Sequence, residues 1–112
     1  MWEKINKQSE ILFHNCLEKK LTVTTAESCT GGMIASSIVS ISGSSAIFKS
    51  SVVTYSNEMK SKILNIPLRS INENGAVSKV IAYAMASNVL NLMNSDVSIA
   101  VTGIAGPGGG SK

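Results

Sequence analysis

The spacing of apolar residues changes repeatedly along the chain, and each change marks an expected element of secondary structure. Apolar side chains recur at intervals of three and four residues in three segments, which predicts helices over 3–19, 33–41 and 80–93. A shorter helix is predicted over 56–66, because Ser56 or Asn57 can cap its first turn and Pro67 follows its end.

Short apolar segments without helical spacing lie between these helices. They predict strands over 21–26, 51–55 and 97–101, with a turn at 43–45 and a polar linker that ends at Gly75. Since strands alternate with helices, the expected fold class is α/β, with a mostly parallel sheet and helices on its faces. The 112 residues correspond to a single domain, 1–112.

Three polar or glycine-rich segments begin at or next to the ends of the three expected strands. They read AESCTGG (26–32), TYSNEMK (54–60) and TGIAGPGGG (102–110). In open α/β sheets, ligands bind beyond the carboxyl ends of the strands. If the strands are parallel, the three segments converge at one edge of the sheet, where we expect the functional site.

Composition excludes several classes of protein. Hydrophobic residues make up 44% of the chain and charged residues 15%, which is typical of a globular protein and not of a disordered one. The net charge of +3 is small and scattered and aromatic residues are few, so nucleic acid is not an expected partner. Because the sequence shows neither an export signal nor a run of about 18 apolar residues, we expect a cytoplasmic protein without a membrane span.

The AESCTGG segment places two candidate nucleophiles, Ser28 and Cys29, at a strand-to-helix turn. Backbone N–H groups at the start of a helix favour negative charge, so they can form an oxyanion hole or bind phosphate. Gly31 and Gly32 would let a substrate approach the backbone closely. The alternative is that Ser28 or Thr30 only caps the helix and the glycines only pack.

Cys29 is intrinsically the better nucleophile of the two, but a cysteine nucleophile usually works with a histidine base. The only histidine, His14, lies in the middle of the first expected helix, away from the strand ends. This placement disfavours a Cys-His enzyme and a Ser-His-Asp triad. Cys16, Cys29 and His14 also lack the spacing of zinc ligands, so no metal is expected.

A serine nucleophile needs a different base, and TYSNEMK supplies Tyr55 and Lys60 as candidates. A lysine can act as a base when burial lowers its pKa, and Ser-Lys pairs are a known variant of the catalytic triad. The alternative is that Lys60 and Lys62 are ordinary solvated lysines and that Tyr55 is an aromatic residue at the edge of the core.

The TGIAGPGGG segment is dense in glycine and includes Gly103, Gly106 and Gly108. Its backbone N–H groups could form an anion-binding nest. It is not a P-loop, because no GK[ST] follows at the required spacing. The alternative is a flexible chain end without a role in binding.

Taken together, AESCTGG, GSS, VVTYSNEMK, GAVS and VTGIAGPGGG resemble, in order and spacing, the C-terminal domain of CinA, the competence-damage-inducible protein. The family includes a stand-alone nicotinamide-nucleotide amidase. The resemblance extends from about residue 5 to the end of the chain. It implies a three-layer α/β/α sandwich, commonly a homodimer, that converts nicotinamide mononucleotide to nicotinate mononucleotide and ammonia with no cofactor or metal.

The resemblance also assigns roles to individual residues. It implies that Ser28 is the nucleophile and that Tyr55, Lys60 and Thr102 belong to the same site. We expect Lys60 to take the serine proton, with Tyr55 as a relay. Two further sets are expected to bind the substrate: the backbone of Cys29, Thr30, Gly31 and Gly32 around the oxyanion, and Thr102, Gly103, Gly106 and Gly108 around the nucleotide.

The chain departs from the family pattern in two places. Ser50 and Ser51 stand where the family usually has glycines. Family domains also continue beyond the glycine-rich segment with another strand and a closing helix, and we expect this chain to lack both. The alternative function is therefore a non-catalytic, nucleotide-binding form of the same domain.

Overall fold

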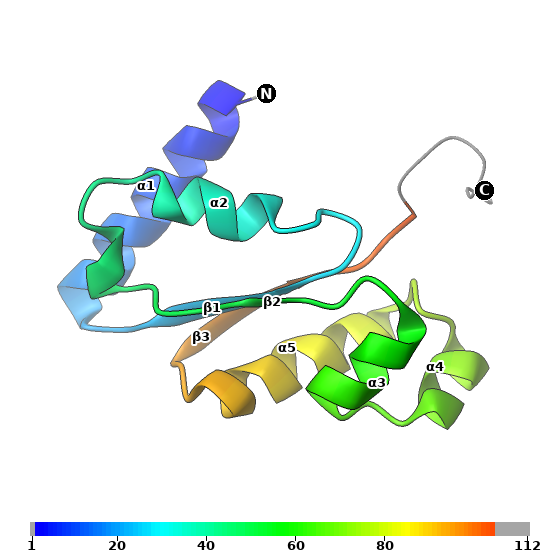
Figure 1. Ribbon diagram of the computed structural model, residues 1–112. Helices are drawn as coiled ribbons and strands as arrows, with labels where there is room; N and C mark the ends of the chain where they lie inside the picture. The colour runs from blue at the N-terminus through cyan, green and yellow to red at the C-terminus, as the bar shows by residue number, and fades with distance from the viewer. Residues whose placement is uncertain (1, 105–112) are drawn as a thin grey trace.

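The computed structural model describes residues 2–104 (Figure 1). Its helices are α1 (Trp2–Lys19), α2 (Met33–Val39), α3 (Asn57–Leu64), α4 (Leu68–Asn74) and α5 (Lys79–Met93), with one 3-10 turn, η1 (Ser44–Ala46). Its strands are β1 (Val23–Glu27), β2 (Val52–Val53) and β3 (Val97–Val101). Within residues 2–104, no helix is both long and apolar enough to cross a bilayer.

The three strands form one parallel sheet in the order β2-β1-β3. β1 pairs with β3 from Val23 opposite Val97 to Glu27 opposite Val101, and Glu27 also lies opposite Val53 of β2. The last residues of the three strands therefore stand in one row across the sheet. This register confirms the predicted parallel arrangement and brings the three following segments to the same edge.

Helices cover both faces of this sheet. Figure 1 shows α1 and α2 on one side and α3, α4 and α5 on the other, which confirms the three-layer α/β/α sandwich. Successive side chains of β1 point to opposite faces, as in any strand. Val23 accordingly packs with a cluster under α1 and α2, and Ala26 with a second cluster under α3, α4 and α5. The first cluster also contains Phe13, Cys16, Ile38 and Ile47. The second also contains Leu64, Ile66, Ile71, Ile81, Met85 and Val89.

Serine side chains cap the starts of α3 and α5, and the cap predicted at Ser56 is confirmed. The Ser56 side chain accepts a hydrogen bond from the Met59 N–H at the start of α3, and Ser78 accepts one from Ile81 at the start of α5. Each serine satisfies a backbone donor that has no partner within its helix. These caps fix where α3 and α5 begin, and α3 carries Lys60.

The prediction of a polar linker before Gly75 is wrong, because most of this segment forms α4. Pro67 ends the preceding segment, but a proline also suits the position just before or at the first turn of a helix, where its missing N–H is not needed. Ile71 is the one buried side chain of α4 and packs into the core beneath α5. One buried residue leaves too weak a hydrophobic period to predict a helix from sequence.

The strand predicted over 51–55 is shorter than expected and covers only Val52–Val53. The Thr54 N–H still donates to the Glu27 carbonyl oxygen at 2.8 Å, but the chain then turns away from the sheet. Tyr55 therefore lies in the connection to α3 instead of in the strand.

Candidate active site

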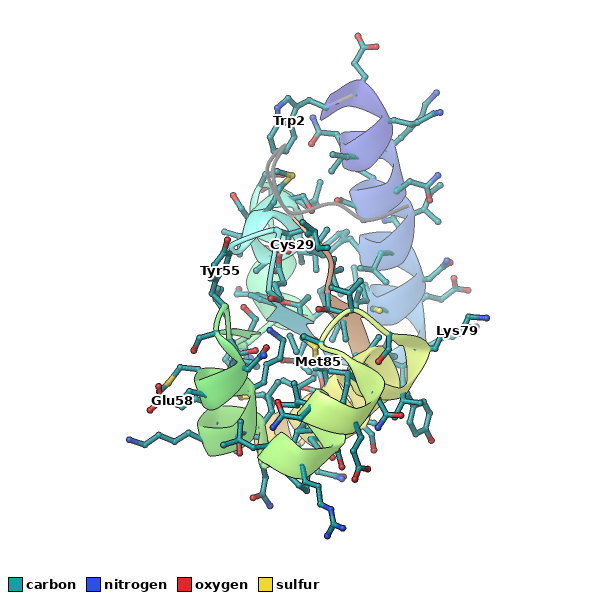
Figure 2. All side chains as sticks on the ribbon, turned by 90° about the vertical axis from the view of Figure 1, so that its right-hand side faces the viewer. Trp2, Cys29, Tyr55, Glu58, Lys79 and Met85 are labelled. Atoms are coloured by element: carbon teal, nitrogen blue, oxygen red, sulfur yellow. The ribbon has the colours of Figure 1, made fainter. Side chains whose placement is uncertain are left out.

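The segments that follow the three strands enclose one small cavity of about 230 Å³. Ser28 comes from the β1–α2 turn, Lys60 from α3, and Thr102 from the segment after β3. The cavity is lined by Ser28, Tyr55, Asn57, Lys60, Ala76, Thr102, Gly103 and Ile104. Figure 2 views the molecule from this edge and labels Cys29 and Tyr55 on it. The structure thus brings together Ser28, Tyr55, Lys60, Thr102 and Gly103, whereas the candidates Cys29, Thr30, Gly31 and Gly32 do not line this cavity.

Ser28 and Lys60 are in direct contact inside this cavity. The Lys60 Nζ donates to the Ser28 Oγ at 3.0 Å. Both side chains are buried, with exposed fractions of 4% for Ser28 and 2% for Lys60. In a strand the side chains of neighbouring residues point to opposite faces, and Ser28, next after Glu27, faces the layer that contains α3. The alternative of a solvated Lys60 is therefore excluded by its burial, whereas Lys62 is exposed.

Lys60 is buried without a carboxylate to neutralise it. The only ion pair among residues 2–104 joins Arg69 to Glu73 on the surface of α4. Burial lowers the pKa of Lys60 below its ordinary value, and the charge of nearby Cys29, when ionised, opposes this only in part. The surroundings of Lys60 therefore favour the neutral amine, which is the form that can accept a proton.

Tyr55 contacts this pair through its backbone and not through its ring. The Tyr55 carbonyl oxygen accepts from Lys60 Nζ at 3.1 Å and from Ser28 Oγ at 3.4 Å. The Tyr55 side chain is 67% exposed, and within residues 2–104 its hydroxyl makes no hydrogen bond to either partner. The carbonyl holds the lysine and the serine side by side, while the relay role of the phenol stays a prediction.

The turn after Ser28 presents several backbone donors. The Ser28 N–H donates to the Val101 carbonyl at 3.0 Å, and the Gly31 N–H to the Ser28 carbonyl at 3.1 Å. Within the described part of the chain, the N–H groups of Cys29, Thr30 and Gly32 have no acceptor. Of the four residues expected around an oxyanion, these three therefore keep a donor available, and Gly31 does not.

Gly31 and Gly32 are needed for the shape of this turn. Their φ angles are +63° and +106°, in the left-handed region that side chains with a Cβ rarely adopt. A Cβ on Gly31 would meet no atom within 4 Å, so backbone conformation and not lack of space requires glycine there.

Sequence reasoning missed Glu27, which stands immediately before Ser28. Its side chain is fully buried. Oε1 accepts from Thr30 Oγ1 at 2.7 Å and from the Ile34 N–H at 2.9 Å, and Oε2 from Thr25 Oγ1 at 3.0 Å and the Ala35 N–H at 2.7 Å. Burial alone raises the pKa of Glu27, but these hydrogen bonds together outweigh it and lower the pKa. The in-out alternation of β1, continued one residue beyond the predicted strand, is the signal that could have found it.

Thr102 and Gly103 form the wall contributed by β3. The Thr102 hydroxyl donates to the Ala76 carbonyl at 2.9 Å, which ties the end of β3 to the start of the α5 segment. A Cβ on Gly103 would lie 3.1 Å from the Cys29 sulfur, so the glycine allows the two segments to approach closely. Gly106 and Gly108 lie outside the described residues. Asn57 also lines the cavity and was not among the predicted site residues.

A second and larger cavity, of about 480 Å³, lies between α1, α2 and Ile99 of β3. Its lining is mostly apolar and includes neither Ser28 nor Lys60. Its polar side chains are Lys4, Gln8, Ser9 and Ser37, none of which belongs to the candidate site. Residues 2–104 also contain no cluster of three or more metal-ligating side chains.

Comparison with known proteins identifies the family of the chain. A sequence model of the CinA C-terminal domain matches residues 5–112. The chain belongs to this family. Its relatives include a CinA-like protein of Prochlorococcus marinus (strain MIT 9515), 51% identical over 104 residues, and one of Endomicrobium trichonymphae, 57% identical over 96 residues. These matches cover 93% and 86% of this chain but 24% and 22% of the relatives, so the chain spans about a quarter of their length.

Solved structures of CinA proteins share the fold. A competence-damaged protein (CinA) superfamily protein of Escherichia coli matches with a TM-score of 0.90 at 36% identity, over 95% of this chain and 62% of that one. The competence/damage inducible protein of Agrobacterium tumefaciens matches with a TM-score of 0.88 at 41% identity, over 96% and 65%. Membership of the CinA family thus has support from sequence and from structure.

Proposed function

We propose that this CinA-family domain is an amidohydrolase in which Ser28 is the nucleophile and Lys60 its base, and that it deamidates nicotinamide mononucleotide. The observation that carries the proposal is the 3.0 Å contact between the Ser28 hydroxyl and the Lys60 amine, both buried at the carboxyl edge of the sheet. A serine nucleophile without a histidine needs another general base, and a lysine of lowered pKa in this position can serve as one.

In the proposed reaction, neutral Lys60 accepts the Ser28 proton while Oγ attacks the carboxamide carbon. The free N–H groups of Cys29, Thr30 and Gly32 stabilise the oxyanion. Lys60 then returns the proton to the leaving nitrogen, ammonia departs, and an ester of Ser28 remains. Water attacks this ester as Lys60 takes its proton and passes it to Ser28 Oγ, which releases nicotinate mononucleotide.

The cavity is smaller than the roughly 300–1,000 Å³ of typical ligand pockets. Its volume of about 230 Å³ suits the reacting carboxamide and its ring and not a whole nucleotide. The ribose and phosphate would therefore extend out of the cavity along the segment that begins at Thr102 and Gly103. The role of Gly106 and Gly108 in positioning the nucleotide stays a prediction, because both lie outside the described residues.

The test is ammonia release from nicotinamide mononucleotide by the purified chain. We expect release by the unaltered protein, and its loss in Ser28→Ala and Lys60→Arg. Arginine stays protonated at all accessible pH values, so it cannot act as the base. Lys62→Arg is the matched control, because Lys62 lies two residues away on α3 with an exposed side chain.

A Lys60→Arg variant as fast as the Lys62→Arg control would rule out Lys60 as the base. Nucleotide binding in calorimetry without ammonia release would favour the alternative function, a non-catalytic nucleotide-binding domain. If the chain neither binds the nucleotide nor releases ammonia, the pyridine nucleotide is no longer the proposed substrate.

A further inference from the structure

Glu27 has more hydrogen bonds than any role in the proposed reaction explains. Each of its carboxylate oxygens accepts one side-chain hydroxyl and one backbone N–H, at distances of 2.7 to 3.0 Å. The side chain is fully buried beneath α2, on the face of the sheet opposite to Lys60. It therefore cannot touch a substrate in the Ser28 cavity, and any effect on the reaction must pass through the groups it binds.

The groups that donate to Glu27 Oε1 lie on either side of the two glycines of the turn. Oε1 bonds the Thr30 hydroxyl just before Gly31, and the Ile34 N–H just after the turn. Glycines lose more conformational freedom on folding than other residues, so a Gly-Gly turn is held only weakly by its own backbone. The single oxygen Oε1 closes a bridge across Gly31 and Gly32 and ties this turn to the end of β1.

We infer that Glu27 is a positioning residue, which holds the turn after Ser28 so that the free N–H groups of Cys29, Thr30 and Gly32 face the reacting carbonyl. The inference rests on the proposed function, because it assigns those N–H groups to the oxyanion. Glu27 acts through Thr30 and through the first turn of α2. It neither donates nor accepts a proton in the reaction.

The donor set requires a carboxylate and not merely a polar side chain. Both oxygens face a backbone N–H, at Ile34 and at Ala35. An amide in Glu27→Gln must direct its NH₂ group toward one of these two donors, whichever way it is flipped. That contact is repulsive, so the variant loses one anchor of α2 even though its volume is unchanged.

Two threonines provide a matched pair of variants for the test. Thr30→Val removes the hydroxyl that ties the turn to Oε1, and Thr25→Val removes the one that reaches Oε2 from within β1. Both delete one hydrogen bond to the same carboxylate, but only Thr30 belongs to the turn. Thr30→Ser keeps the hydroxyl and serves as the conservative rescue.

We expect kcat for ammonia release to fall about 100-fold in Glu27→Gln and about 10-fold in Thr30→Val, with KM changed less than about twofold. Thr25→Val should lower the melting temperature by as much as Thr30→Val does, but its kcat should equal that of the unaltered protein. Thr30→Ser, which keeps the hydroxyl, should also have the kcat of the unaltered protein. The double variant Glu27→Gln/Thr30→Val should be no slower than Glu27→Gln alone. Equal loss of kcat in both valine variants, or no rescue by Thr30→Ser, would overturn the inference.

Amide hydrogen exchange separates this inference from the proposed function. Exchange at Met33 and Ile34, whose N–H groups donate to the Thr30 carbonyl and to Glu27 Oε1, should be faster in Thr30→Val than in Thr25→Val, with exchange in α5 equal in the two, whether or not the chain releases ammonia. If the unaltered chain releases no ammonia but exchange differs in this way, the amidase fails and the positioning of the turn stands. Identical exchange in the two variants would contradict the positioning role by itself, even if Glu27→Gln does not fold.

Discussion

Two ionisable side chains are buried at the same end of the sheet, Glu27 under α2 and Lys60 on the opposite face. Both have a lowered pKa, yet the consequences are opposite. Glu27 is surrounded by four donors, so its charged form is stabilised despite burial. Lys60 has only a hydroxyl and a carbonyl as partners and no carboxylate within the described residues, so burial favours its neutral form.

The difference shows how one edge of a sheet can hold a fixed charge on one face and a proton acceptor on the other. Donors from the backbone cannot be withdrawn without unfolding the start of α2, so Glu27 keeps its charge over a wide pH range. Lys60 lies beside a cavity and can gain and lose a proton as chemistry requires. We expect variants of both residues to lose activity but to change the free energy of unfolding in opposite directions.

The largest expected effect is on activity, in Lys60→Met. Removing a general base lowers rates by about 10²- to 10⁴-fold, so ammonia release should nearly vanish. The free energy of unfolding should instead rise by about 1 kcal/mol at neutral pH, because an uncompensated buried amine is replaced by an apolar side chain of similar length. Steady-state kinetics and denaturant unfolding measure the two quantities. A variant that is both inactive and less stable would mean that Lys60 is a structural anchor.

The second prediction concerns the pH dependence of the rate. The neutral amine is the base, so ammonia release should rise roughly tenfold per pH unit and level off as pH passes the folded-state pKa of Lys60, below its ordinary value of 10.5. Stability should follow the same group, since the unfolded chain binds this proton more tightly than the folded chain. The stability advantage of Lys60→Met should therefore be full below the folded pKa and disappear above about pH 10.5. A rate that is flat with pH would contradict this assignment.

Glu27→Gln should change the free energy of unfolding in the direction opposite to Lys60→Met. It leaves a buried backbone donor unsatisfied, so we expect the free energy of unfolding to fall by about 1–3 kcal/mol at neutral pH. The folded-state pKa of Glu27 lies below its ordinary value of 4.5, so the carboxylate contributes its full stability above pH 4.5 and loses it as pH falls through the folded pKa. The difference between variant and unaltered protein should therefore narrow in acid. Urea unfolding at several pH values measures it, and a difference that widens in acid would exclude a lowered pKa.

The same contrast explains what the sequence could reveal and what it could not. The position of Lys60 beside Ser28 follows from local patterns, since parallel strands bring their carboxyl ends together and Ser56 marks where α3 begins. Burial of Lys60 was left open, because a lysine pattern on a helix is the same whether the side chain faces water or a core. The alternation of β1 predicts the face on which Glu27 lies, but its hydrogen bonds to residues seven and eight positions ahead depend on where α2 packs and have no signature in a strand.

Errors elsewhere have a similar origin. The linker before Gly75 forms α4 because tertiary packing of Ile71 stabilises a short helix that its sequence alone does not favour. The Tyr55 ring, expected at the core edge or in the relay, is exposed because the strand ends two residues earlier than predicted. Except for α4, element type was predictable from periodicity, whereas element ends and side-chain directions depend on neighbours distant in sequence.

The smallest expected effect concerns Thr54, a third buried polar residue at this edge. Its N–H donates to the Glu27 carbonyl, but its fully buried hydroxyl has no partner within residues 2–104. Unlike Glu27, it is unsatisfied, and unlike Lys60, it cannot escape the penalty by changing its protonation state. Thr54→Val should therefore raise the free energy of unfolding by about 1 kcal/mol, because a buried polar group without a partner costs about 1–3 kcal/mol, and should leave ammonia release unchanged. Lower stability in this variant, with unchanged backbone packing, would mean that the Thr54 hydroxyl has a hydrogen-bond partner after all.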